Sequence, residues 1–199
     1  PSRRRTPFDL IASERKYELF FASTRAYHDL FGSPNATECE ARGIEPALCA
    51  TFQDSLRGAV IAFLDTHVRG SERARAWLQN EAPSLAPEQG FEWRSGRAPT
   101  FSTPEGPCPG YANCLYTPDS YEIETLSPQR VTYTDVTGRA RTVEFTIRLP
   151  RNRSGALPVA IWAHGGGDGR NAPGASVGAL SVWNEIGARA GYLSISPAF

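Results

Sequence analysis

The sequence lacks an excess of charge of either sign and has almost no lysine. Its 199 residues include 21 basic and 21 acidic side chains, so the formal net charge is zero, and Lys16 is the only lysine. This balance argues against a nucleic-acid-binding chain, because such proteins draw affinity from a summed positive charge. No apolar run approaches the length that crosses a bilayer, and no charged-then-apolar leader opens the chain. We therefore expect no membrane span and no signal peptide still attached.

Metal-binding patterns are also missing. The sequence has no Cys-x-x-Cys pair, and none of its three histidines stands at ligand spacing from a cysteine. We therefore expect no metal site and no cofactor. The composition, 40% apolar and 21% charged, is ordinary for a folded protein, and the length suits one medium domain or two small ones.

Four cysteines fall into two local pairs, Cys39 with Cys49 and Cys108 with Cys114. Pairing within each set would close two short loops, and it is one of three possible connectivities. Disulfides would indicate a secreted or periplasmic protein. The alternative is four independent buried thiols, because cysteine packs well as a small apolar residue.

Proline and glycine concentrate near residues 80 to 110, and such density breaks a helix or a central strand. We therefore divide the chain into a helical segment at 1–80, a linker at 81–110 and a strand-rich segment at 111–199. The residues that mark the break are Pro83, Pro87, Gly90, Gly96, Pro99, Pro104, Gly106, Pro107, Pro109 and Gly110.

Helical spacing dominates before this break. Helices are predicted over Ser13–Phe21 and Ser23–Phe31, and most clearly over Asp54–Val68, where Asp54 can act as the N-cap. Ser71 is predicted to cap a further short helix. The third helix has one apolar face, formed by Leu56, Ala59, Val60, Phe63, Leu64 and His67 or Val68. The short helix places Ala74, Trp77 and Leu78 on one side.

Strand patterns dominate after the break. Arg130–Val136 and Arg141–Leu149 alternate between apolar and polar residues, and the Thr137-Gly138 turn between them predicts an antiparallel hairpin. Leu157–Ala163 is a continuous apolar run, which is expected of a strand covered on both faces.

A second helix–strand pair completes this segment. Val177–Ala190 has helical spacing through Leu180, Trp183 and Ile186, with Gly191 as its stop, and Tyr192–Ser196 is predicted to be a buried strand. The order of strand, loop, helix and strand predicts a βαβ unit, and such units build parallel sheets.

Glycines follow the apolar strand in the sequence His164-Gly165-Gly166-Gly167-Asp168-Gly169. Glycine lets backbone N–H groups approach a ligand closely. A phosphate loop fits poorly, because a Walker loop needs a lysine and the dinucleotide fingerprint would need glycine at Arg170. An oxyanion hole fits better, since fixed N–H donors can lower the barrier to acyl transfer by about 3–4 kcal/mol each. A glycine-rich turn without a ligand is the structural alternative.

Leu157 to Phe199 resembles the early sheet of an α/β-hydrolase, with a strand, a His-Gly-x-Gly loop, helix A and a strand ending in Ser-Pro. It is similar to dienelactone-hydrolase, chlorophyllase and platelet-activating-factor-acetylhydrolase-like esterases. The resemblance implies a three-layer α/β sheet, with a hairpin plus parallel strands flanked by helices. It also implies that Gly166 is the N–H donor and that His164 is a loop residue. Residues 52–78 resemble the closing helices of the same enzymes, so the order is permuted or incomplete, unless this is an unrelated helical domain.

A serine hydrolase also needs a nucleophile and a base. Gly174-Ala175-Ser176-Val177-Gly178 matches Gly-x-Ser-x-Gly, but loop residues precede it, so we interpret Ser176 as a helix N-cap before a weak nucleophile candidate. The histidines are His28, His67 and His164, and none occupies the position that the resemblance implies for the base. We expect the nucleophile and the base to lie outside these residues, in a missing segment or a second chain.

The sequence therefore predicts a serine esterase that acts on a small-molecule or polymeric ester, with no nucleic-acid partner. The first alternative is a non-catalytic hydrolase-like or helical binding module, whose apolar faces around Phe63 and Trp183 would meet a partner. The second alternative is a nucleotide-binding βαβ domain with phosphate at the glycine loop.

Overall fold

The structure, a computed structural model, describes residues 9–13, 16–21, 40, 43–82, 91–95, 115–126, 128–163 and 175–198. The chain divides into two compact units, one built mainly from residues up to Thr117 and one built mainly from Pro118 onward. We call them the helical unit and the sheet unit.

The helical unit is built on α4 (Pro46–His67). This helix starts at Pro46 and not at the predicted Asp54, because proline fits the first helical turn, where an N–H has no intrahelical partner. By length and apolar composition alone α4 could cross a membrane, contrary to the sequence-based expectation. This is weak evidence, since core helices and signal sequences share those properties. Its buried face consists of Cys49, Phe52, Ser55, Gly58, Ala59, Ile61, Ala62, Asp65 and Thr66.

The predicted short helix is confirmed as α5 (Glu72–Ala76). The Ser71 side chain accepts a hydrogen bond from the Ala74 N–H at 3.2 Å, which is the capping contact that the sequence predicts. The helix continues as a π-helical turn, η1 (Trp77–Glu81). Ala74, Trp77 and Leu78 are buried, as their shared side predicts.

The predicted helix at Ser13–Phe21 is wrong over its second half. Residues Tyr17–Phe21 form strand β1, which pairs antiparallel with β2 (Phe91–Ser95), a strand inside the predicted linker. The run Tyr-Glu-Leu-Phe-Phe is rich in aromatic residues, which suit a pleated sheet, and its partner lies far away in sequence. The predicted helix at Ser23–Phe31 lies outside the described residues.

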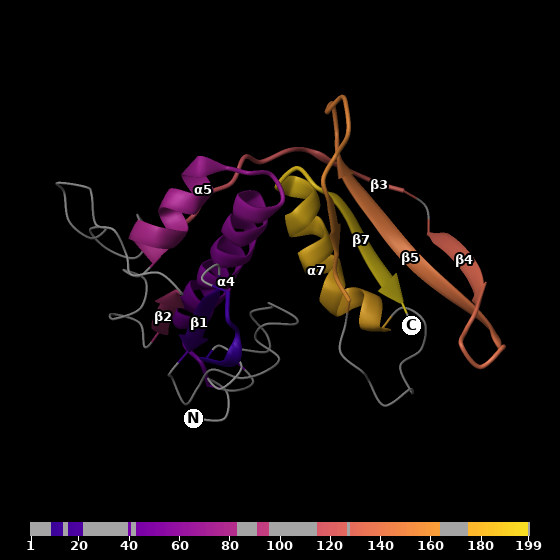
Figure 1. Cartoon of the computed structure of the whole chain (residues 1–199), viewed down its shortest axis with the longest axis horizontal. Helices are drawn as coiled ribbons and strands as arrows, with labels where there is room; N and C mark the ends of the chain where they lie inside the picture. The colour runs from indigo at the N-terminus through magenta and orange to yellow at the C-terminus, as the bar shows by residue number, and fades with distance from the viewer. Residues whose placement is uncertain are drawn as a thin grey trace. The chain divides into compact units, whose positions relative to one another are not determined.

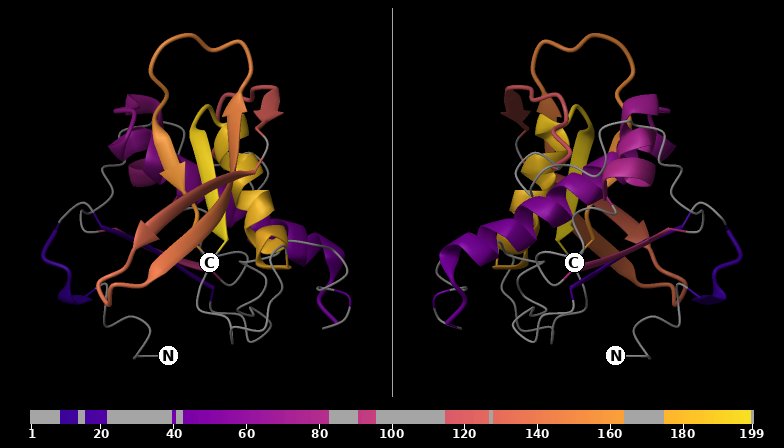
Figure 2. Two further views of the ribbon diagram at one scale, coloured as in Figure 1. Left: turned by 90° about the vertical axis from the view of Figure 1, so that its right-hand side faces the viewer. Right: turned by 90° about the vertical axis from the view of Figure 1, so that its left-hand side faces the viewer.

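The predicted hairpin of the sheet unit is confirmed, as Figures 1 and 2 show. Strand β4 (Gln129–Thr134) pairs antiparallel with β5 (Ala140–Pro150). A short strand that the sequence did not predict, β3 (Ile123–Thr125), pairs with the other end of β5. The opposite edge of β5 pairs with β7 (Leu193–Ala198), again antiparallel.

The predicted βαβ unit is also confirmed. Strand β6 (Val159–Ile161) lies parallel to β7, and α7 (Ala175–Arg189) connects them. The sheet therefore has the order β3-β5-β7-β6, with β4 beside β5. Helix α7 packs along β5 and β7 (Figure 1). Gly191 has a φ of +95°, which fits its predicted role as the helix stop.

The expectation that the β6 strand is buried on both faces is wrong. Ala160 is buried, whereas Val159 is 50% exposed and Ile161 is 65% exposed. Successive side chains of a strand point to opposite faces, and within the described part of this unit a helix covers only one face. The general α/β class holds, with a mixed sheet and flanking helix.

Candidate functional site

The candidate site lies where strand β6 ends. Ala160 is level with Ser194 and Ile161 with Ile195 in the parallel pairing, so the carboxyl ends of β6 and β7 share one edge of the sheet. Ligands of open α/β sheets bind at such an edge. The glycine segment leaves from it after Ala163. His164, Gly165, Gly166 and Gly167 lie outside the described residues, and the structure describes the elements on both sides of them.

Trp162 fixes the last residues of β6 before the glycine segment. Its backbone N–H donates to the Ile195 carbonyl at 2.9 Å, which extends the ladder past the end of the strand. Its indole Nε1 donates to the Ser194 Oγ at 2.7 Å. Its ring stacks on Trp183 of α7, with centroids 5.5 Å apart and planes at 26°. The residue two positions before the glycine segment is therefore held by a backbone hydrogen bond, a side-chain hydrogen bond and a ring contact with α7.

Helix α7 comes unusually close to the sheet at Gly187. A Cβ atom on Gly187 would stand 2.7 Å from the Ser194 Oγ and 3.0 Å from a carbon of the Trp162 ring. Real Cβ atoms essentially never come closer than 3.0 Å to another atom, so a side chain at residue 187 would force Ser194 to shift. Because residue 187 has no side chain, α7 packs directly against the hydrogen-bonded side chains of Trp162 and Ser194.

Two more buried polar side chains lie on α7 and β7. Asn184 Nδ2 donates to the Thr146 carbonyl of β5 at 3.0 Å, and Thr146 is the register partner of Ser196. The Asn184 Oδ1 and the Ser196 Oγ are buried and have no hydrogen-bond partner in the described part of the chain. The layer under α7 therefore includes buried polar side chains, although the sequence suggested only an apolar helix face.

Ser176 lies in the first turn of α7, which begins at Ala175. Strand β6 ends at Ile161, so Ser176 does not follow a strand directly, as a nucleophile elbow requires. Because α7 already includes Ala175, Ser176 lies inside the first helical turn and not at the N-cap position that the sequence predicts.

Of the three histidines, the structure describes only His67. Its ring lies 4.6 Å from Phe63 and 6.0 Å from Tyr17, centroid to centroid, within an aromatic cluster of the helical unit. His67 is nevertheless exposed, so its ring contacts both these aromatic side chains and solvent at the end of α4. His28 and His164 lie outside the described residues. No group of His, Cys, Asp or Glu side chains that could hold a metal occurs within the described ranges.

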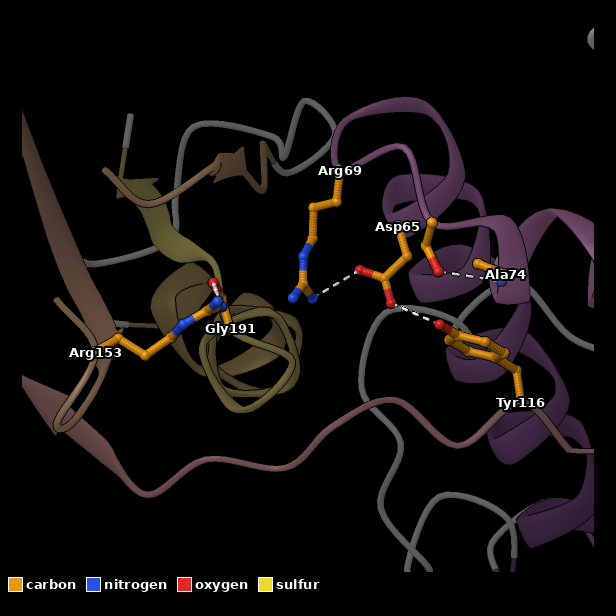
Figure 3. A network of polar contacts seen from close by, with 7 residues as sticks. Asp65, Arg69, Ala74, Tyr116, Arg153 and Gly191 are labelled. Atoms are coloured by element: carbon orange, nitrogen blue, oxygen red, sulfur yellow. Dashed lines mark hydrogen bonds and ion pairs between the residues drawn. The ribbon is translucent and has the colours of Figure 1, made fainter. Parts of the chain in front are cut away.

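Sequence reasoning missed a polar cluster in the helical unit (Figure 3). Tyr116 donates its hydroxyl to Asp65 Oδ2 at 2.8 Å, and Arg69 donates to Asp65 Oδ1 at 3.1 Å. Both Asp65 and Tyr116 are buried. Burial and the Asp65 hydrogen bond raise the pKa of Tyr116 to about 12. In the sequence, only Asp65, the one acidic residue on the buried face of α4, signalled this contact, because its partner is distant in sequence.

A second contact, within the sheet unit, holds the end of α7 (Figure 3). The Arg153 guanidinium lies 5.0 Å from the Tyr121 ring centroid and donates to the Gly191 carbonyl at 3.5 Å. The Tyr121 N–H donates to the Arg189 carbonyl at 2.9 Å. A cation near the carboxyl end of a helix is favourable because of the helix dipole. These contacts are structural.

Cys49 is buried on α4, and its sulfur is disulfide-bonded. Gln53 Nε2 donates to this sulfur at 3.2 Å. Cys39, Cys108 and Cys114 lie outside the described residues, so the pairing of Cys39 with Cys49 and of Cys108 with Cys114 stays a prediction.

No protein-family model, curated protein or solved structure matches the chain.

Proposed function

We propose that the chain is a serine carboxylic-ester hydrolase of the α/β-hydrolase type, with His164 to Gly167 as its oxyanion loop. The observation that carries the proposal is the position of this segment between the carboxyl end of β6 and helix α7 of a parallel βαβ unit. The antiparallel β4–β5 hairpin comes before this unit, which is the order that the resemblance implies.

Ester hydrolysis passes through a tetrahedral intermediate whose oxygen gains negative charge. Backbone N–H groups aimed at that oxygen stabilise it, and loss of one donor lowers kcat by about a hundredfold to a thousandfold. In the proposal Gly166 supplies one such donor. Gly165 and Gly167 allow the substrate to approach the backbone, because no side chain stands in the way.

A donor of this kind contributes only if its position is fixed before the reaction. Trp162 supports the proposal here, because its ring is held between Ser194 and Trp183 just before the glycine segment. The supporting contacts come from a strand and a helix, which position a site more firmly than loops do.

In this proposal the nucleophile and the base lie outside these 199 residues, in a further segment or a second chain. Ser176, in the first turn of α7, is the one serine with a matching motif, and its place in a helix argues against that role. We further propose a secreted or periplasmic location, in keeping with a disulfide at Cys49, and a small-molecule or polymeric ester as substrate.

The competing function is a non-catalytic binding module. Exposed apolar side chains favour it, among them Phe63, which is 41% exposed, and Ile161 of β6. The predicted contribution of Trp183 to such a surface is wrong, because Trp183 is buried against Trp162.

Activity-based labelling tests the proposal. The full-length protein is incubated with a fluorophosphonate probe and with short-chain p-nitrophenyl esters, and the labelled peptide is identified by mass spectrometry. We expect turnover, and a label on a serine other than Ser176 that persists in Ser176→Ala. A label on Ser176 itself would overturn our assignment of the nucleophile. Neither label nor turnover would favour the binding module.

A further inference from the structure

The outer edge of the sheet at β4 is exposed along its whole length. All six residues of Gln129–Thr134 are solvent-exposed, and within the described chain β4 pairs only with β5. An edge strand presents unpaired N–H and C=O groups and is a template for another strand. Natural edges are usually protected by charged side chains, proline, a bulge or shortness. Strand β4 contains no proline, and its one charged side chain, Arg130, forms an ion pair with Glu144 of β5.

The backbone groups of β4 that face outward can be identified from its pairing with β5. The Asp135 N–H donates to the Arg139 carbonyl, and the Thr132 and Thr142 hydroxyls meet at 2.9 Å across a close pair. In an antiparallel ladder, hydrogen-bonded and non-hydrogen-bonded pairs alternate, and the side chains of the latter lie closer. Residues 129, 131 and 133 therefore bond to β5, and Arg130, Thr132 and Thr134 direct their backbone groups outward.

We propose that this edge is a homodimer interface, in which β4 pairs antiparallel with β4 of a second copy about a twofold axis at Thr132. This register places Thr132 opposite its own copy and Arg130 opposite Thr134. All three outward-facing residues then form hydrogen-bonded pairs, each exchanging both backbone bonds. Registers centred on Val131 or Tyr133 would leave one of these residues without an equivalent partner, because Pro128 has no N–H and Val136 lies in the turn.

The side chains suit the same register. Val131 and Tyr133, which are 51% and 49% exposed, would lie opposite Tyr133 and Val131 of the second copy. Aromatic and β-branched residues make favourable cross-strand pairs, and the closeness of non-hydrogen-bonded pairs strengthens them. The fully exposed Val136 at the hairpin tip would stand level with Pro128 of the second copy.

Charges do not oppose this pairing. Arg130 is the only side chain of β4 that is charged at neutral pH, and it forms an ion pair with Glu144 of β5 at 2.8 Å. Its counterpart in the second copy is Thr134, so no like charges face each other. The pairing is self-complementary, as a twofold interface must be, and it joins the two sheets into one.

Charged substitutions at Thr132, the centre of the proposed interface, test the proposal. Sedimentation velocity of the full chain over a concentration series should show a reversible dimer. Thr132→Lys and Thr132→Glu each place like charges opposite one another, so we expect each to weaken dimerisation about tenfold or more. An equimolar mixture of the two should restore the dimer, and Thr132→Val, which keeps a β-branched residue, should retain it.

Amide exchange locates the interface independently of these variants. Protection of the Thr132 N–H should rise with protein concentration, because that group points outward in a single copy. Far-UV circular dichroism of each variant checks that it folds. A protein that stays monomeric throughout the series would overturn the proposal, and so would a dimer that neither charged variant weakens.

Discussion

The indole of Trp162 donates to the Ser194 hydroxyl at 2.7 Å and joins the residue that follows β6 to the second residue of the parallel strand β7. Ser194 is completely buried, and the ring of Trp162 is stacked on Trp183 of the covering helix. The glycine segment begins two residues later. The contact therefore determines where the proposed oxyanion loop leaves the sheet.

Trp162→Phe should destabilise the protein by about 1–3 kcal/mol, because the buried Ser194 hydroxyl loses its donor and the stacked pair loses area. Denaturant unfolding of this variant, of Ser194→Ala and of the double variant measures the coupling between the two side chains. We expect the double variant to cost less than the sum of the single ones. Strict additivity would show that the two side chains do not act together.

Gly187→Ala should also destabilise, by about 1–3 kcal/mol, because the added methyl meets Ser194 and Trp162 at 2.7–3.0 Å. Gly58→Ala is the matched control within α4, since its Cβ would meet the Tyr116 backbone at an ordinary 3.4 Å. Alanine favours a helix over glycine by about 1 kcal/mol, so the control should lose much less stability. Equal losses of unfolding free energy would argue against the close packing at Gly187.

The Tyr116–Asp65 contact should make stability fall at alkaline pH. The pKa of Tyr116 is about 12 in the folded protein, above the value of about 10 expected for an unfolded chain. A raised folded pKa gives a contribution that is complete below pH 10 and is lost as pH rises toward 12. Unfolding midpoints measured from pH 8 to pH 12 should show this loss. Tyr116→Phe should remove it, whereas Tyr133→Phe, at an exposed tyrosine, should not.

The hairpin turn should resist acid because of Asp135. Its carboxylate accepts from the Thr137 hydroxyl, from Arg141 and from the backbone N–H groups of Thr137 and Arg139. The Thr137 and Arg141 contacts hold the pKa of Asp135 well below its usual range. A lowered folded pKa gives a contribution that is complete above about pH 4 and is lost only as pH falls through the folded value.

Amide exchange of Thr137 and Arg139 measures the stability of this turn. We expect their protection to persist to about pH 3 and to fall in Asp135→Asn at every pH, whereas Asp119→Asn, an exposed control, should change nothing. Loss of protection at the ordinary carboxyl pKa of about 4 would contradict the account.

Much of the sheet unit could be predicted from the sequence, because local patterns specify it. Alternation between Val143 and Leu149 gives the hairpin, and Gly191 ends the helix where a positive φ is needed. The exposure of Ile161 could not be predicted in this way. A continuous apolar run indicates that a strand can be buried on both faces, but it does not show which faces other elements cover.

The helical unit was harder to predict, since its decisive contacts join distant residues. Tyr17 to Phe21 has a spacing that predicts a helix, yet it pairs with a strand 70 to 78 residues away. In the sequence, Asp65 is an acidic residue on a mostly apolar helix. Its burial is explained by the hydrogen bond from Tyr116, which lies 51 positions later in the chain. At the candidate site, the glycine motif could be identified, but the support from Trp162, Ser194 and Gly187 depends on strand register.

The most direct test of the central claim compares two proline variants within the glycine segment. Gly166→Pro removes the N–H group that the account assigns to the oxyanion, and Gly169→Pro makes the same change outside that assignment. With p-nitrophenyl acetate as substrate, kcat should fall about a hundredfold to a thousandfold in Gly166→Pro and much less in Gly169→Pro. Equal loss of kcat in the two variants of the full-length protein, or a full-length wild-type protein without turnover, would contradict the account.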